Sequence, residues 1–98
     1  MERQQILRIL QANRHQLKRD YAVKTLALFG SVARGESTAH SDVDLLVEFS
    51  RPIGLLHLIQ TELYLESLLG VERVDLILRR AVLPELKEEI FAEALDAI

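Results

Sequence analysis

One stretch near the middle of the chain constrains the fold more than any other feature. The apolar run Leu26–Phe29 leads into Gly30-Ser31, and after ten further residues comes Asp42-x-Asp44 inside a second apolar run. This pattern predicts two strands connected by a sharp turn, a short helix and a polar loop. Because alternate residues of a strand point to the same face, we expect Asp42 and Asp44 to project together.

Two carboxylates that share a strand face repel each other unless a positive charge lies between them. At a separation of about 5 Å and an effective dielectric constant near 20, the repulsion is about 3 kcal/mol. A hard divalent cation relieves it, and Mg²⁺ usually binds one or two carboxylates together with substrate phosphates. Gly30 permits close approach of the backbone to a phosphate, and Ser31 adds a hydroxyl at the start of the short helix. Taken alone, Gly30-Ser31 can also be a simple turn followed by a helix cap.

This spacing resembles the signature of the DNA polymerase β-like nucleotidyltransferases. The segments GSVARGE (30–36) and SDVDLLV (41–47) are similar to their smallest branch, the minimal nucleotidyltransferase (MNT) domains. Many MNT domains are antitoxins that are paired with HEPN-domain ribonuclease toxins. The resemblance extends from about Leu26 to Leu78, and it implies an α+β fold in which a small mixed β-sheet carries helices mainly on one side. The face with the carboxylates is then expected to stay open as a cleft.

The resemblance also implies the metal site. The family takes a third carboxylate from a later strand, and Val74-Asp75-Leu76 fits that position. Asp42, Asp44 and Asp75 are therefore the expected catalytic residues and the expected ligands of two Mg²⁺ ions, with Mn²⁺ as a possible substitute. Whether Asp75 acts as a base, as a metal ligand or as both stays open.

The nucleotide site is implied in the same way. The substrate is expected to be ATP, with Gly30 and Ser31 holding its β- and γ-phosphates. Arg34 has two open roles: it contacts the triphosphate, or it orients a carboxylate through a bidentate bond.

The remaining elements follow from hydrophobic periodicity. Residues 2–20 are expected to form one amphipathic helix, whose apolar face consists of Ile6, Ile9, Leu10 and Leu17. Residues 23–29 are expected to form the first strand and residues 71–78 the third. A long helix is predicted for residues 55–69, ended by Gly70, and a last helix begins near Pro84. The side chains expected on the core-facing side of the long helix are Leu55, Leu56, Ile59, Leu63 and Leu69, with Leu58 and Leu65 widening this stripe. Those expected to share one face of the last helix are Leu86, Ile90, Ala94 and Ile98.

Length and composition exclude several other classes of protein. The 98 residues are expected to form a single domain, 1–98, with no cysteine for disulfides and no apolar run near the roughly 20 residues of a membrane span. The net charge of −3 argues against direct binding of nucleic acid. We therefore expect a cytoplasmic protein.

Larger relatives of this kind carry a second domain that holds the base or the acceptor, and a chain of this length is expected to lack one. The resemblance then implies that a HEPN toxin supplies the acceptor, a tyrosine hydroxyl to which AMP is transferred. Two alternatives stay open. One is an inactive antitoxin that silences its partner by binding alone, and the other is a nucleotidyltransferase that acts on a small molecule.

Overall fold

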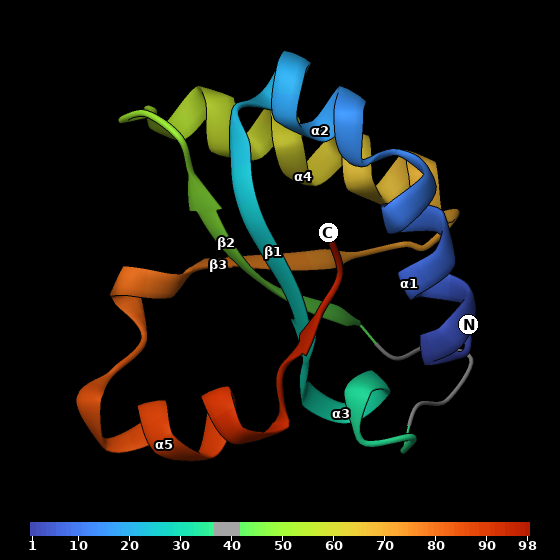
Figure 1. Ribbon diagram of the computed structural model, residues 1–98, viewed down its shortest axis with the longest axis vertical. Helices are drawn as coiled ribbons and strands as arrows, with labels where there is room; N and C mark the ends of the chain where they lie inside the picture. Colours follow the sequence, from blue (N-terminus) through green and yellow to red (C-terminus); the bar gives the residue numbers. More distant parts are fainter. Residues whose placement is uncertain (37–41) are drawn as a thin grey trace.

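The computed structural model describes residues 1–36 and 42–98, which form a mixed sheet flanked by helices (Figure 1). The elements in chain order are α1 (Arg3–Ala12), α2 (Arg14–Tyr21), β1 (Val23–Phe29), α3 (Gly30–Ala33), β2 (Val43–Phe49), α4 (Leu55–Leu69), β3 (Val74–Leu78), a 3-10 turn (Arg79–Ala81), α5 (Pro84–Glu93) and β4 (Leu95–Asp96). Residues of the predicted polar loop, His40 and Ser41 among them, lie outside the described residues. Within the described part, no helix is long and apolar enough to cross a membrane.

The sheet has the strand order β3-β2-β1-β4. β1 is antiparallel to both β2 and β4, whereas β2 and β3 are parallel. A parallel pair needs a long crossover connection, and here α4 provides it. This arrangement confirms the predicted α+β class with a small mixed sheet.

The two faces of the sheet are covered unequally (Figure 1). α1, α2 and α4 cover one face, and the main core lies between them and the sheet, where Ile6, Leu10, Leu28, Leu45 and Leu65 are fully buried. The other face carries α5. The second, smaller cluster lies under that helix and consists of Ala27, Leu46 and Val82 with Phe29, Ile90, Phe91 and Ala94 packed against them. The face with the carboxylates is therefore covered in part by α5 and is less open than the sequence suggested.

The predicted N-terminal helix is wrong in one respect, because it is two helices. α1 ends at Asn13, whose side-chain amide donates to the carbonyl of Ile9 at 2.8 Å. An asparagine side chain that bonds a carbonyl four residues back competes with the helical backbone, and the chain changes direction there. Leu10 and Leu17 are buried on the two sides of the break, so the core-facing residues were predicted correctly although the helix was not continuous.

The bounds of α4 agree with the prediction, but the predicted core-facing side is wrong. Leu69 is buried as expected, whereas exposed fractions are 72% for Leu55, 69% for Leu56, 41% for Ile59 and 59% for Leu63. Leu65, which was expected at the margin of the stripe, is fully buried, and so is Thr61, which was not predicted.

Two hydrogen bonds explain this rotation of α4. Glu66 accepts a bond of 2.9 Å from the backbone N–H of Val74, and Glu62 accepts a longer one of 3.5 Å from that of Leu76. An edge strand leaves alternate N–H groups unpaired, and α4 is turned so that its glutamates satisfy those of β3.

The C-terminal segment also departs from the prediction. The last helix starts at Pro84 as expected but ends at Glu93, and β4 then pairs with β1 through Ala27–Asp96 and Leu28–Leu95. Leu86, which was placed on the buried face, is 42% exposed. The short strand was missed because two residues are too few to show a periodicity.

Candidate active site

The centre of the site is a pair of carboxylates on neighbouring strands. The parallel register of β2 and β3 places Asp44 opposite Asp75. Because adjacent strands are about 4.8 Å apart and residues in register share a face, the two side chains lie side by side. Asp42 directly precedes β2, and its side chain is 45% exposed against 32% for that of Asp75. The structure therefore brings together the three predicted carboxylates from two segments that are about 30 residues apart.

The pKa of Asp44 is raised by its surroundings. Burial is the largest cause, the negative charges of Asp75 and Asp42 add to it, and together they raise the pKa of Asp44 from 3.8 to about 6. A hydrogen bond between Asp44 and Asp75 acts in the same direction, and the positive charge of Arg34 opposes it. The ionised pair is thus costly in the absence of a cation, which is the situation that a metal ion relieves.

Arg73 lies beside these carboxylates, and this contact was not predicted. The Nε atom of Arg73 donates to Oδ1 of Asp75 at 3.1 Å and lies 3.9 Å from Oδ2 of Asp42. Its guanidinium therefore contacts two of the three carboxylates. The sequence contains a signal for this contact, because Arg73 and Asp75 are two residues apart at the start of a strand and so share a face.

The carboxylates have the oxygen ligands that a hard divalent ion prefers, but by themselves they do not complete its coordination. In residues 1–36 and 42–98, no group of three potential ligands is gathered closely enough to hold a metal. Asp44 and Asp75 nevertheless provide an all-oxygen pair, and Mg²⁺ or Mn²⁺ needs only one or two carboxylates when substrate phosphates complete its coordination. The donor chemistry therefore fits the expected ions.

The predicted turn lies directly against this pair. Gly30 has φ of +77°, a region that favours glycine, and a Cβ atom built on it would collide with the carboxylate of Asp44. Phe29, the residue before it, is opposite Asp44 in the antiparallel register of β1 and β2. α3 then begins at Gly30, with Ser31 in its first turn. The sequence placed the Gly-Ser turn and the aspartates at one site from their spacing, and the backbone does bring them together.

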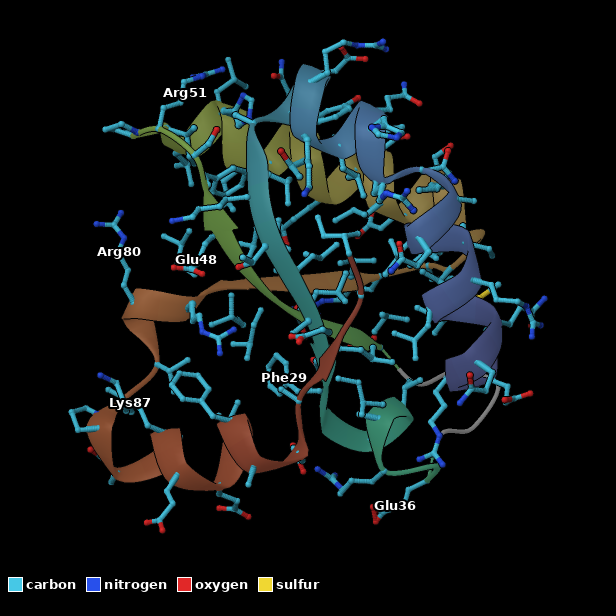
Figure 2. The ribbon with its side chains drawn as sticks, viewed as in Figure 1. Phe29, Glu36, Glu48, Arg51, Arg80 and Lys87 are labelled. Carbon is cyan, nitrogen blue, oxygen red and sulfur yellow. The ribbon has the colours of Figure 1, made fainter. Side chains whose placement is uncertain are left out.

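Arg34 contacts a carboxylate that the sequence analysis did not single out. Its Nη1 atom lies 3.2 Å from Oε1 and 3.1 Å from Oε2 of Glu93, and its Nε donates to Glu36 at 2.7 Å. The backbone N–H of Gly30 also donates to Oε1 of Glu93, at 3.1 Å. Figure 2 shows Phe29 and Glu36 on either side of this turn. Nothing in the sequence distinguishes Glu93 from the other glutamates of α5, so only the fold reveals it.

A separate cavity lies at the other end of β2. It has a volume of about 400 Å³ and is lined in part by Glu48, Arg51 and Arg80 (Figure 2). Glu48 accepts a hydrogen bond of 2.8 Å from the hydroxyl of Thr25 and lies four residues along the strand from Asp44. Because a strand rises about 3.3 Å per residue, Glu48 lies well away from the aspartates and belongs to this cavity.

A glycine turn that lies against a pair of carboxylates on neighbouring strands is the arrangement expected for nucleotidyl transfer. Comparison with known proteins leads to the same class of enzyme. The profile of the nucleotidyltransferase domain family matches residues 8–96. The chain belongs to this family.

Individual relatives indicate which branch of this family the chain belongs to. A candidate protein adenylyltransferase of Methanocaldococcus jannaschii is 45% identical over 78 residues, which are 80% of this chain and 79% of the relative. The protein adenylyltransferase MntA of Thermococcus cleftensis is 38% identical over 90 residues, covering 92% and 90% of the two chains. These matches confirm the predicted minimal nucleotidyltransferase branch and the predicted enzyme class, an adenylyltransferase.

Solved structures agree with this assignment. A candidate minimal nucleotidyltransferase superposes with a TM-score of 0.74 at 40% identity and covers 97% of this chain and 95% of its own. A complex of a tri-AMPylated Shewanella oneidensis HEPN toxin with its MNT antitoxin shares the fold, with a TM-score of 0.65 at 19% identity over 94% of this chain and 71% of the other.

Proposed function

We propose that this protein transfers AMP from ATP to a hydroxyl of a HEPN-domain ribonuclease toxin in the cytoplasm and thereby acts as its antitoxin. The observation that carries the proposal is the contact between the turn at Gly30 and the Asp44–Asp75 pair, which brings a phosphate-binding backbone next to a divalent-cation site. Membership of the family supplies the class of reaction.

In the proposed reaction, the acceptor oxygen forms a bond to the α-phosphorus of ATP while the bond from that phosphorus to the α–β bridging oxygen breaks. Pyrophosphate leaves, and Asp75 takes the proton of the hydroxyl. Asp42, Asp44 and Asp75 would hold two Mg²⁺ ions, which when bound stabilise the attacking and leaving oxygens. Gly30 and Ser31 hold the β- and γ-phosphates in line with the acceptor, so that catalysis consists of positioning and electrostatic stabilisation.

The identity of the acceptor is inferred from the relatives. MntA of Thermococcus cleftensis is named as a protein adenylyltransferase, and the Shewanella oneidensis complex contains an AMP-modified HEPN toxin bound to an MNT antitoxin. A partner of the same kind would present a hydroxyl to the carboxylate face, and we propose that this hydroxyl belongs to a tyrosine.

The test is the intact mass of a HEPN partner that is expressed together with this protein. Wild type should make the partner heavier by whole AMP units and suppress its ribonuclease activity. Asp42→Asn combined with Asp44→Asn should bind the partner but leave its mass unchanged. Asp20→Asn is a matched control, because Asp20 pairs with Arg19 on the surface of α2 and makes no contact with the site.

Two results would overturn the catalytic proposal. One is an unmodified partner in cells that contain wild type. The other is equal protection of cells by wild type and the double variant at the same level of expression, because protection would then require binding alone.

A further inference from the structure

The N–H of Gly30, which is proposed to hold phosphate, and the guanidinium of Arg34, for which triphosphate is one of two open partners, already hold an anion of the protein itself. Oε1 of Glu93 accepts a hydrogen bond of 3.1 Å from the backbone N–H of Gly30, and Nη1 of Arg34 lies within 3.2 Å of both oxygens of the same carboxylate. The side chain of Glu93 is only 21% exposed, so it is packed into this position. One carboxylate therefore joins the turn to the arginine that follows it.

A carboxylate and a phosphate compete for such donors because both offer oxygen anions to N–H groups. The N–H of Gly30 cannot give its full hydrogen bond to Glu93 and to a phosphate oxygen at the same time. Arg34 does not depend on Glu93 for its charge balance, because Glu36 is bound at 2.7 Å on its other side. The contact with Glu93 can therefore be exchanged for a phosphate while Arg34 stays paired.

We propose that Glu93 sets the nucleotide affinity of this enzyme by occupying the position that a phosphate of the nucleotide takes when it binds. The nucleotide binds by displacing the Glu93 carboxylate from Gly30 and Arg34. This inference rests on the proposed function in one respect, that Gly30 binds phosphate, and it assigns Arg34 to the triphosphate as well. Because Glu93 is the last residue of α5, its side chain can swing away while the pairing of β4 with β1 is retained.

The opposite role for Glu93 gives an effect of opposite sign. If Glu93 only positions Arg34 for the substrate, its removal leaves the guanidinium less ordered and weakens the binding of phosphate. If Glu93 competes with the phosphate, its removal strengthens that binding. A measurement of affinity therefore separates the two roles.

The experiment is calorimetric titration of the full chain with inorganic tripolyphosphate in the presence of a chelator, and with ATP and Mg²⁺ in a parallel series. Glu93→Gln should bind tripolyphosphate about fivefold more tightly than wild type, the scale of one partly exposed ion pair. Glu93→Asp, which keeps the charge on a shorter side chain, should show a smaller gain. Glu89→Gln makes the same charge change on the same helix, at an exposed residue whose side chain makes no hydrogen bond to the described residues, and should match wild type within twofold.

Every other outcome overturns the proposal. Weaker or equal binding by Glu93→Gln contradicts competition, and an equal gain in Glu89→Gln shows a general effect of charge. If Glu93→Gln does not fold, Glu93→Asp and the carboxyl ¹³C resonance of Glu93 in wild type decide, because that resonance should shift as tripolyphosphate is added. A failure to bind tripolyphosphate in all variants also overturns it.

These outcomes are separate from those for the proposed function. Tripolyphosphate contains neither adenosine nor an acceptor, so a gain in Glu93→Gln can be found even if no partner becomes AMP-modified. Conversely, modification of the partner together with unchanged phosphate affinity in Glu93→Gln leaves the proposed function intact and removes only this inference.

Discussion

Replacing Asp44 with asparagine should stabilise the metal-free protein at neutral pH, although it removes a residue of the site. The pKa of Asp44 is raised to about 6 in the folded state by burial and by the negative charges of Asp75 and Asp42. In the unfolded chain the same group has its ordinary value of 3.8. The folded state therefore binds the proton more tightly, and the stability of wild type falls as the pH rises from about 4 to about 7. Asparagine cannot ionise, so it escapes this loss.

The size of the effect follows from the two pKa values. A rise from 3.8 to about 6 corresponds to at most about 3 kcal/mol between the protonated and ionised forms. Below about pH 4 the group is protonated in both states, and wild type and Asp44→Asn should have similar stabilities. Above about pH 7 the variant should be more stable by about 1–3 kcal/mol, since relaxation of the site and solvent reduce the ideal value.

The assay is urea unfolding in a chelating buffer at several pH values between 4.5 and 8. The difference in unfolding free energy between Asp44→Asn and wild type should grow with pH and level off above about pH 7. Asp20→Asn is the control, because the hydrogen bond from Arg19 lowers the pKa of Asp20 and its removal should not produce a gain that grows in this window. Parallel stability curves for wild type and Asp44→Asn would show that the carboxylate pair is not under electrostatic strain.

Three further predictions concern the metal response and the glycines. Mg²⁺ or Mn²⁺ at one hundred times its dissociation constant should stabilise wild type by about 2.7 kcal/mol, which a rise in melting temperature would report. Asp42→Asn combined with Asp44→Asn should lose this response, and a retained response would place the metal elsewhere. In urea unfolding, Gly54→Ala should leave the unfolding free energy nearly unchanged, because φ of Gly54 is −92° and the added Cβ meets nothing within 4 Å. Gly70→Ala should lower the unfolding free energy by about 1–2 kcal/mol, because φ of Gly70 is +68°. Gly30→Ala should cost more than Gly70→Ala and should also weaken ATP binding in calorimetry, because its Cβ collides with Asp44; equal costs at the two positions would refute the close approach of the turn.

The parts of the fold that the sequence predicted are those with a strong local signal. β1 and α4 have the predicted bounds because apolar runs and glycines mark their ends. The core-facing side of α4 was not predictable in the same way, because leucines surround much of this helix and its periodicity is weak. That side is determined by Glu62 and Glu66, which reach the edge of β3, and the contact depends on which strand lies at the edge.

The same reasoning explains what was found and missed at the site. The resemblance to the nucleotidyltransferases pointed to Gly30, Asp44 and Asp75 because each belongs to a short motif on a strand or a turn. Glu93 belongs to no pattern, and it reaches the turn only because β4 anchors the end of α5 beside β1. Contacts of this kind link residues about 60 positions apart, and no local property of the chain encodes them.

In the described structure, each half of the site contacts one side chain of opposite charge. Arg73 contacts Asp42 and Asp75, which are expected to face a cation, and Glu93 contacts Arg34 and the N–H of Gly30, which are expected to face a phosphate. These contacts offset part of the cost of bringing like charges together, although Arg73 does not reach Asp44, whose pKa stays raised. A metal–nucleotide complex carries both signs of charge, so it can take the place of Arg73 and of Glu93 in one binding event. A bare anion must displace Glu93 while Arg73 stays in place, and a bare cation must displace Arg73 while Glu93 stays. If both proposed sites are correct, we therefore expect the complete metal–nucleotide complex to bind more tightly than either component alone.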